Sequence, residues 1–344
     1  MSEEIHTAAI RRITRILATM RAPGSPVRAM HSADRAEAPA PPPALDITHT
    51  DGEALSRHVA QGRIERLGRS LYIESCDATA GGDHEQYEQS IMREVRRVLA
   101  HGGGSAWFSH STAALLHGAW TYRVPRLVHV THAVNPHVDS DEASIVRRHH
   151  TSLPQRDRDR VSGVPVTTKE RTLVDCVRTL PTAAALVVCD SLFRCGADPR
   201  QVDLLMSTSK GKRGIVQARR ILELCDPRAG SPGESVARLA AVDAGLPRPE
   251  CQIEAPTRSG TYYVDLGWED LKVAVEFDGD VKYSGGEYGD PEAARRAELA
   301  RQRALEQEGW IVIRVRWEDL ADLDELGARV RAAYWAALRR RRAA

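Results

Sequence analysis

The sequence predicts a mixed α/β protein of the α+β class, and three observations support this prediction. Apolar and polar residues alternate with the period of a strand over residues 261–268 (TYYVDLGW) and 271–277 (LKVAVEF). Elsewhere apolar residues recur at helical spacing, for example in residues 85–102 (EQYEQSIMREVRRVLAHG). Strand and helix patterns follow one another through the middle and the end of the chain, which predicts sheets covered by helices.

Length and composition are those of a soluble globular protein with more than one domain. The chain has 344 residues, 42% of them hydrophobic and 28% charged, and its net charge is +1, so any nucleic-acid-binding surface must be local. Six scattered cysteines without a CxxC pair argue against a disulfide framework and a cysteine zinc site, and favour a cytoplasmic location. No run of about 18 apolar residues is present, so we expect no membrane span.

The chain begins with a predicted helix and a linker. Residues 1–21 carry apolar residues at the spacing of a short amphipathic helix: Ile10, Ile13, Leu17 and Met20. Residues 22–46 are rich in proline and alanine, and they are predicted to be an extended linker.

Residues 47–83 have the pattern of a degenerate winged helix. A helix pattern stops near Gly62, and two short strands are predicted around Gly68. The helix and the hairpin would present basic side chains to DNA phosphates, namely Arg57, Arg63, Arg66 and Arg69. A solvated charged face explains the same residues equally well.

Residues 84–227 are predicted to form an α/β middle domain. We expect a strand that leads into a helix capped by Ser109 or Ser111, a charged loop over residues 147–163 and a buried helix over residues 182–196. Three histidines, His129, His132 and His137, lie close together in the sequence. Because no carboxylate or cysteine lies at ligand spacing, we interpret them as strand-end histidines and not as metal ligands.

The last region, residues 228–344, contains the residues that indicate chemistry. Ser231, Pro232 and Glu234 have the spacing of a helix N-cap with a capping box, which gives Glu234 a structural role. In the later strand, period-two alternation places Glu276 and Asp278 on one face, opposite the valines.

Asp265 lies on the preceding strand, and antiparallel pairing would bring its carboxylate toward Glu276. Carboxylates that converge on one face repel one another unless a cation lies between them, and oxygen ligands of this kind suit Mg²⁺ or Mn²⁺. The helix after this strand is expected to place basic and polar side chains nearby, where they would contact nucleic acid: Arg295, Arg301 and Gln302.

These patterns resemble two known families. Asp265, ten intervening residues, Glu276-Phe-Asp278-Gly, Lys282-Tyr and GWIVIRVRWEDL resemble the Vsr-like domain of unknown function in the PD-(D/E)XK nuclease superfamily. Upstream, the stretches SLYI, FSHSTAALLHG and VPVTTKERTLVDCVRTLP resemble AbiEi-type antitoxin regions, which are often fused to that domain in actinobacterial proteins.

The nuclease resemblance implies a mixed sheet flanked by helices and a divalent ion held by Asp265 and Glu276 that supports hydrolysis of DNA. Glu234 matches the helical acid that often completes the metal site, Asp278 stands at the usual lysine position, and Lys282 is expected to supply the missing positive charge.

The antitoxin resemblance implies a possible cognate toxin. It leaves open a different function, that of a non-catalytic DNA-binding regulator or antitoxin of a type IV toxin–antitoxin system. A third interpretation has the acids paired with Arg295 or Lys282 and binding no metal.

Overall fold

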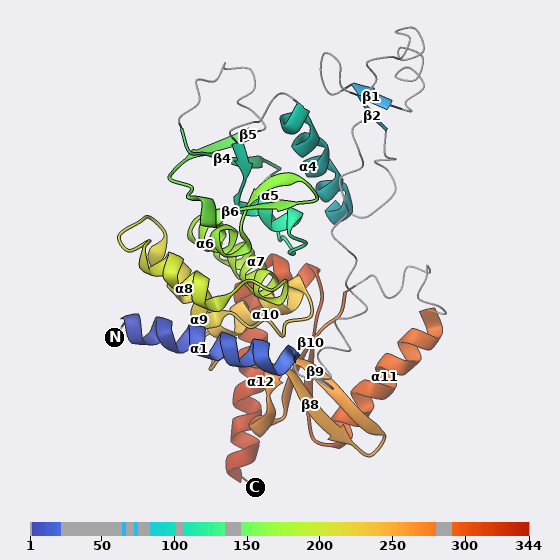
Figure 1. Ribbon diagram of the computed structural model, residues 1–344. Helices are drawn as coiled ribbons and strands as arrows, with labels where there is room; N and C mark the ends of the chain where they lie inside the picture. Colours follow the sequence, from blue (N-terminus) through green and yellow to red (C-terminus); the bar gives the residue numbers. More distant parts are fainter. Residues whose placement is uncertain are drawn as a thin grey trace. The chain divides into compact units, whose positions relative to one another are not determined.

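The computed structural model describes residues 2–21, 64–66, 72–74, 83–100, 106–124, 126–134, 146–279 and 291–343 (Figure 1). These residues contain ten α-helices, two mixed sheets and a two-stranded hairpin, which confirms the predicted α+β class. The chain divides into two compact units, Met1–Arg35 with Val177–Ala344, and Ala36–Cys176. This division falls inside the predicted middle domain, whose boundaries stay a prediction.

Helix α1 (Ser2–Arg21) is the predicted amphipathic helix. Ile10, Ile13 and Leu17 are buried, and the helix packs on α8 (Pro199–Ser207) and α9 (Ile215–Leu224). The guanidinium of Arg12 donates hydrogen bonds of 2.8 Å and 2.7 Å to the carbonyl oxygens of Glu223 and Cys225, at the end of α9. It therefore satisfies carbonyl groups that the helix itself leaves without a partner. The predicted linker lies outside the described residues.

Part of the predicted winged-helix region is described. Strands β1 (Ile64–Arg66) and β2 (Tyr72–Glu74) form an antiparallel hairpin, as expected. The predicted helix before them lies outside the described residues, together with Arg57, Arg63 and Arg69. The backbone of Arg66 is in β1, but its side chain is not described. A DNA-binding role for these arginines therefore stays a prediction.

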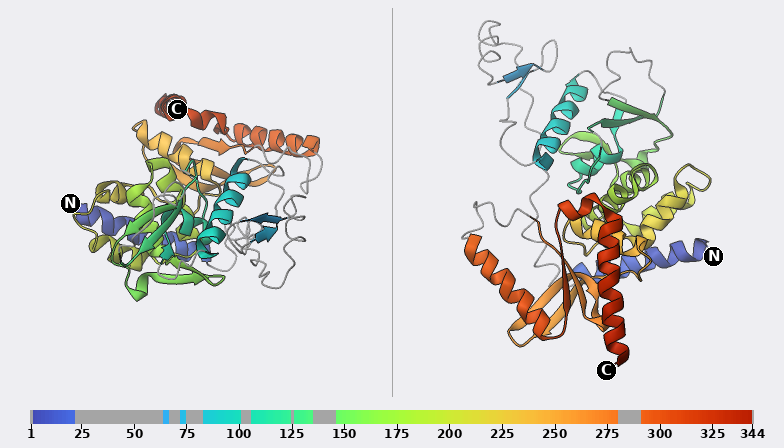
Figure 2. Two further views of the ribbon diagram at one scale, coloured as in Figure 1. Left: turned by 90° about the horizontal axis from the view of Figure 1, so that it is seen from above. Right: turned by 180° about the vertical axis from the view of Figure 1, so that it is seen from behind.

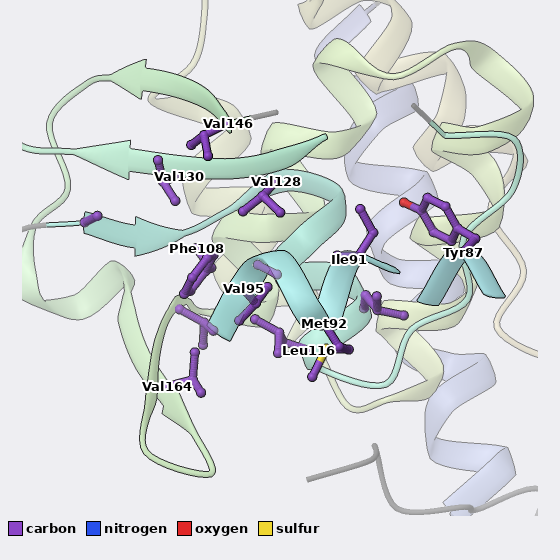
Figure 3. Packing of buried hydrophobic residues seen from close by; sticks show 14 residues of the cluster. Tyr87, Ile91, Met92, Val95, Phe108, Leu116, Val128, Val130, Val146 and Val164 are labelled. Carbon is purple, nitrogen blue, oxygen red and sulfur yellow. The ribbon is translucent and has the colours of Figure 1, made fainter. Parts of the chain in front are cut away.

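A five-stranded sheet forms the centre of the second unit. Its strands lie in the order β5-β4-β3-β7-β6. Their bounds are β3 (Ala106–Phe108), β4 (Val128–His132), β5 (Val146–His150), β6 (Arg158–Val161) and β7 (Val164–Thr167). Helices α4 (Asp83–Ala100) and α5 (His110–Leu116) contribute to its core, where Tyr87, Ile91 and Val95 pack with Phe108 and Val130 (Figure 3). Helix α6 (Lys169–Thr179) follows β7, as predicted.

The charged loop expected over residues 147–163 is largely wrong, because this segment contributes to β5 and contains β6. Strand β5 pairs in parallel with β4, and β6 pairs with β7 through a turn in which Ser162 and Gly163 have φ of 48° and 82°. Both strands have several solvent-facing positions and little apolar alternation. These two strands therefore form because they pair with apolar neighbouring strands. Their own sequences do not show the alternation of a strand.

The first unit contains a helical layer formed by α1, α7 (Thr182–Arg194), α8, α9 and α10 (Pro232–Asp243). Helix α7 is buried along most of its length, as predicted, and it packs against α9 and α10. Arg238 of α10 is fully buried and forms an ion pair with Asp190 of α7. Asp190 also accepts a hydrogen bond of 2.6 Å from Ser235, so α7 and α10 are joined by a buried polar network.

The sheet of this unit has four strands in the order β11-β10-β9-β8. Strands β8 (Glu250–Thr257), β9 (Gly260–Trp268) and β10 (Val273–Phe277) are antiparallel neighbours, and β11 (Ile311–Val315) is parallel to β10. The sheet lies between α11 (Pro291–Gln307) and α12 (Leu323–Ala343) (Figures 1 and 2). Ala274 belongs to a cluster with Leu305 of α11, whereas Phe277 packs on Gly233 of α10. The predicted alternation along β10 is thus confirmed.

No helix in the described ranges has the length and apolar character needed to cross a membrane. The five cysteines in these ranges are free thiols.

Candidate metal centre

Two predicted site residues, Asp265 and Glu276, meet on neighbouring strands of the four-stranded sheet. Pairing of Leu266 with both Cys251 and Val275 sets the registers on the two sides of β9. One residue further along the strands, the same registers place Asp265 of β9 between Gln252 of β8 and Glu276 of β10. Gln252 has a φ of 54°, which is uncommon for a residue other than glycine. Strand pairing therefore brings Asp265 to Glu276, as the sequence predicts.

Asp265 and Glu276 are linked through the backbone of β10. The N–H of Phe277 donates a hydrogen bond of 2.9 Å to Oδ2 of Asp265. Glu276 is 6% exposed, and its Oε2 lies 2.6 Å from Nη2 of Arg301 in α11. Its second oxygen, Oε1, is buried and has no hydrogen-bond partner among the described residues. Glu276 therefore has one paired and one unpaired oxygen beside a second carboxylate.

Glu234 has the capping-box geometry that the sequence predicts. Its N–H donates to Oγ of Ser231 at 3.2 Å, and that hydroxyl donates to Oε1 of Glu234 at 3.0 Å. Oε2 accepts hydrogen bonds from the N–H of Gly230 at 2.7 Å and from Nε2 of Gln252 at 3.2 Å. The structural role of Glu234 is confirmed, and its role as a metal ligand stays a prediction.

Burial and mutual repulsion change the acidity of two of these carboxyl groups. Burial, followed by the nearby charge of Asp265, raises the pKa of Glu234 from 4.5 to about 8. The same causes raise the pKa of Glu276 to about 8, although the guanidinium of Arg301 acts in the opposite direction. A cation between the carboxylates would lower both pKa values, because it would offset the repulsion.

Asp278 lies just beyond the end of β10, and it faces an arginine. Its Oδ2 lies 3.4 Å from Nη1 of Arg314 in β11. Arg314 also contacts Glu298 at 2.9 Å and Oε1 of Gln302 at 3.0 Å. The sequence did not identify Arg314 as a partner of Asp278. The alternation of side chains along GWIVIRVRW could have indicated this pairing. The other predicted residue at this site, Lys282, lies outside the described residues.

Of the three residues of α11 that are predicted to bind nucleic acid, two already have partners in the protein. Arg301 contacts Glu276 and donates to the carbonyl oxygen of Tyr263. Gln302 accepts from Arg314 and donates to Glu306. The helix backbone at Arg295 is described, but its side chain is not. Glu276 thus pairs with Arg301, whereas the partners that the pairing interpretation named, Lys282 and the side chain of Arg295, are not described.

The residues fit a hard divalent cation in part. Oε1 of Glu276 is a buried oxygen without a partner, and Asp265 supplies a second carboxylate, which is the ligand set that Mg²⁺ and Mn²⁺ prefer. The acids do not form a compact three-ligand cluster. Within the described ranges, three side chains whose ligand atoms lie within 4.8 Å of one another occur instead at His110, His129 and His149. A third acidic ligand would require Glu234 to exchange hydrogen bonds for the cation.

Comparison with known proteins gives two findings. Residues 106–224 match the family described as the AbiEi antitoxin C-terminal domain. Two relatives come from Mycobacterium tuberculosis, the uncharacterized protein MT2308 of strain CDC 1551 / Oshkosh and the uncharacterized protein Rv2248 of strain H37Rv. Each is 30% identical to this chain over 241 residues, which is 70% of this chain and 84% of the relative.

Proposed function

This chain belongs to the family of the two mycobacterial proteins and contains an AbiEi antitoxin C-terminal domain, and from this premise we propose that it acts in a toxin–antitoxin context as a metal-dependent phosphodiesterase on DNA. The antitoxin domain supports the context. The acidic site in the four-stranded sheet supports the activity.

The observation that supports the proposed activity is the environment of the Glu276 carboxylate. Its Oε1 is buried without a hydrogen bond among the described residues, next to the charge of Asp265. Leaving a buried carboxylate oxygen without a partner costs free energy, and a fold has reason to avoid this cost. A divalent cation held by Asp265 and Glu276 would remove it. Such a cation supplies an activated water molecule and stabilises the charge that builds on a phosphate.

The basic residues around the site have a consistent role in this proposal. When Glu276 becomes a cation ligand, the guanidinium of Arg301 loses part of its attraction to Oε2 and can turn to a phosphate oxygen. Asp278, held by Arg314, is positioned to accept a hydrogen bond from water at the end of β10. Arg314 keeps its contacts with Glu298 and Gln302, so it holds Asp278 and leaves phosphate binding to Arg301.

Cleavage of DNA by the purified full chain tests the proposed activity. We expect nicking of plasmid DNA with Mg²⁺ or Mn²⁺, and loss of nicking on adding a chelator. Glu276→Gln is expected to lower the rate at least a hundredfold, since a neutral amide oxygen binds a divalent cation more weakly than a carboxylate does. Glu254→Gln is the matched control, because Glu254 is an exposed acid in the same sheet.

Absence of cleavage with either cation, on double-stranded DNA, single-stranded DNA and RNA, would refute the phosphodiesterase proposal. Equal cleavage by the wild type and Glu276→Gln would place any activity elsewhere or in a contaminant.

A second function has a specific observation in its favour. The AbiEi match covers residues 106–224 and ends before Glu234, so a regulator that binds DNA or a toxin would need none of the acids. We propose this as the alternative to hydrolysis. It predicts salt-dependent binding to the promoter of its own gene that is unchanged in Glu276→Gln. Relief of the growth arrest caused by a neighbouring toxin gene, unchanged in the same variant, would support it.

A further inference from the structure

Three histidines of the five-stranded sheet unit form a compact cluster that the proposed function does not use. His110 begins α5, His129 lies in β4 and His149 lies in β5. Their ligand nitrogens all lie within 4.8 Å of one another. We propose that His110, His129 and His149 form a binding site for a divalent transition metal ion of the zinc class. This site is separate in sequence and in chemistry from the acidic site.

The spacing of the nitrogens suits such an ion. Nδ1 of His129 lies 3.0 Å from Nε2 of His149. Two nitrogens that each lie 2.0–2.1 Å from a tetrahedral zinc ion are about 3.3 Å apart. The two rings must therefore separate by about 0.3 Å and turn so that both lone pairs face the ion, which then replaces the proton that the nitrogens share. The ring of His110 stacks on that of His149 with centroids 3.8 Å apart, which keeps the third ligand beside this pair.

A hydrogen-bond chain orients the ring of His110. Its Nδ1 lies 3.0 Å from Oγ of Ser109, and this hydroxyl accepts a hydrogen bond of 2.8 Å from Thr131. Metal-binding histidines commonly use one ring nitrogen for the ion and the other for such a hydrogen bond, which fixes the direction of the ring. The geometry therefore assigns Nε2 of His110 to the metal. Ser109, one of the two predicted N-caps, stands at the N-cap position, but its side chain makes no cap hydrogen bond and contacts the histidine instead.

The backbone at His110 supports a specific role for this side chain. Its φ is 51°, in the left-handed region that residues other than glycine seldom adopt. Backbone strain of this kind persists only where the surrounding structure enforces it. Residues in this conformation therefore cluster at functional sites. Hydrogen bonds of the neighbouring backbone hold the segment in place: the N–H of Ser109 donates to the carbonyl oxygen of His129 at 3.0 Å, and the N–H of His129 donates to Oγ1 of Thr112 at 2.9 Å.

Electrostatics favour imidazoles in the neutral form that binds metals. Burial is the main cause that lowers the pKa of His129 and of His149 to about 4. His129 and His149 are half-buried, so the cluster is reachable from solvent.

Ligand type and charge define the class of ion. Imidazole suits zinc, copper, nickel and iron, whereas magnesium and calcium require oxygen ligands. Three neutral ligands leave the ion with its full charge, and Arg147, which also lowers both pKa values, adds positive charge nearby. A three-histidine site keeps an open fourth position. We therefore expect water, hydroxide or another small anion at that position, on the side of Arg147.

Metal binding to the full chain tests this inference. The protein is treated with a chelator, dialysed and titrated with Zn²⁺, in the Glu276→Gln background so that the acidic site does not contribute. We expect one zinc ion per chain with a dissociation constant at or below about the micromolar range. Substitution with Co²⁺ is expected to give visible bands of a low-coordinate nitrogen site without the near-ultraviolet bands of thiolate ligation.

Single substitutions locate the ion. His129→Gln and His149→Gln are each expected to weaken zinc binding at least tenfold. Ser109→Ala is expected to weaken it roughly 10-fold to 100-fold, as losses of hydrogen bonds to metal ligands do. His150→Gln is the matched control, because His150 is the exposed neighbour of His149 at the end of the same strand.

X-ray absorption of the wild-type protein with zinc gives a result that does not depend on how the variants fold. We expect scattering from three imidazole rings, with nitrogens at about 2.0–2.1 Å. Zinc binding that is undetectable, equal in His149→Gln and the control, or dominated by sulfur or carboxylate ligands would overturn the proposal. Each of these outcomes would mean that the three histidines pack as neutral rings only.

Discussion

Nη2 of Arg301 lies 2.6 Å from Oε2 of Glu276, and this ion pair joins helix α11 to strand β10 at the candidate metal centre. The pair places a positive charge beside the carboxylate that the proposed cation would bind. Glu276 therefore has two alternative partners, an arginine of its own chain and a metal ion. The balance between them determines how strongly the site retains a cation.

Replacing Arg301 by glutamine is expected to raise the affinity for Mn²⁺ roughly tenfold, which is equal to about 1.4 kcal/mol. The reason is that the variant removes a positive charge that competes for Glu276. Calorimetric titration of the full chain measures the effect, and Arg303→Gln, on the exposed side of the same helix, is the control. DNA cleavage should fall in the same variant if Arg301 contacts phosphate. Unchanged or weaker Mn²⁺ binding would show that Glu276 is not a ligand.

The raised pKa values predict how the stability of the metal-free protein depends on pH. The pKa of Glu276 is raised from 4.5 to about 8, so between these values the folded protein binds a proton that the unfolded chain releases. The free energy of unfolding should therefore decrease as the pH rises from about 5 to about 8. Glu276→Gln should flatten this dependence, whereas Glu254→Gln should retain it. Urea denaturation with chelator at several pH values measures the slope, and equal slopes in both variants would contradict the prediction.

The acidic site could be predicted from the sequence because its main contacts are local in the chain. Asp265 and Glu276 lie on strands joined by a short connection, so alternation and antiparallel pairing are sufficient to bring them together. The arginines that pair with them could not be assigned. The sequence predicts that Arg301 lies near the acids. Which face of its helix meets the sheet depends on how α11 packs on β10, and no local pattern gives this packing.

The histidine cluster shows a similar limit. His129 was considered with His132 and His137 because they are close in sequence, but His137 lies outside the described residues and His132 is not part of the cluster. The residues beside His129 come from α5 and from β5, the latter by parallel pairing with β4. Such pairing leaves no local pattern, and the sequence predicts a loop over most of β5.

The buried pair of Arg238 and Asp190 is expected to be essential for the stability of the helical layer. Asp190→Ala would leave the guanidinium buried without its counter-charge, at a cost of roughly 3–5 kcal/mol. The control is Asp243→Ala, which breaks the exposed pair of Asp243 with Arg220 and should cost less than about 1 kcal/mol. Denaturant unfolding of the full chain compares them. Similar losses in both variants would show that burial does not set the value of the pair.

Gly233→Ala is expected to disturb the acidic site through packing alone. A Cβ at this position would lie 2.1 Å from Cζ of Phe277, whose ring is also held edge-on against Trp317 with centroids 4.9 Å apart. The ring must shift, and it would carry with it the end of β10 that holds Glu276. We expect a loss of roughly 1–3 kcal/mol in the free energy of unfolding. Gly279→Ala is the control, because the nearest atom to its Cβ is 3.8 Å away, at ordinary contact distance. Mn²⁺ titration of both variants completes the experiment. Weaker binding in Gly233→Ala alone would mean that the position of Phe277 sets the geometry of the site. Equal binding would mean that β10 keeps its place without this contact.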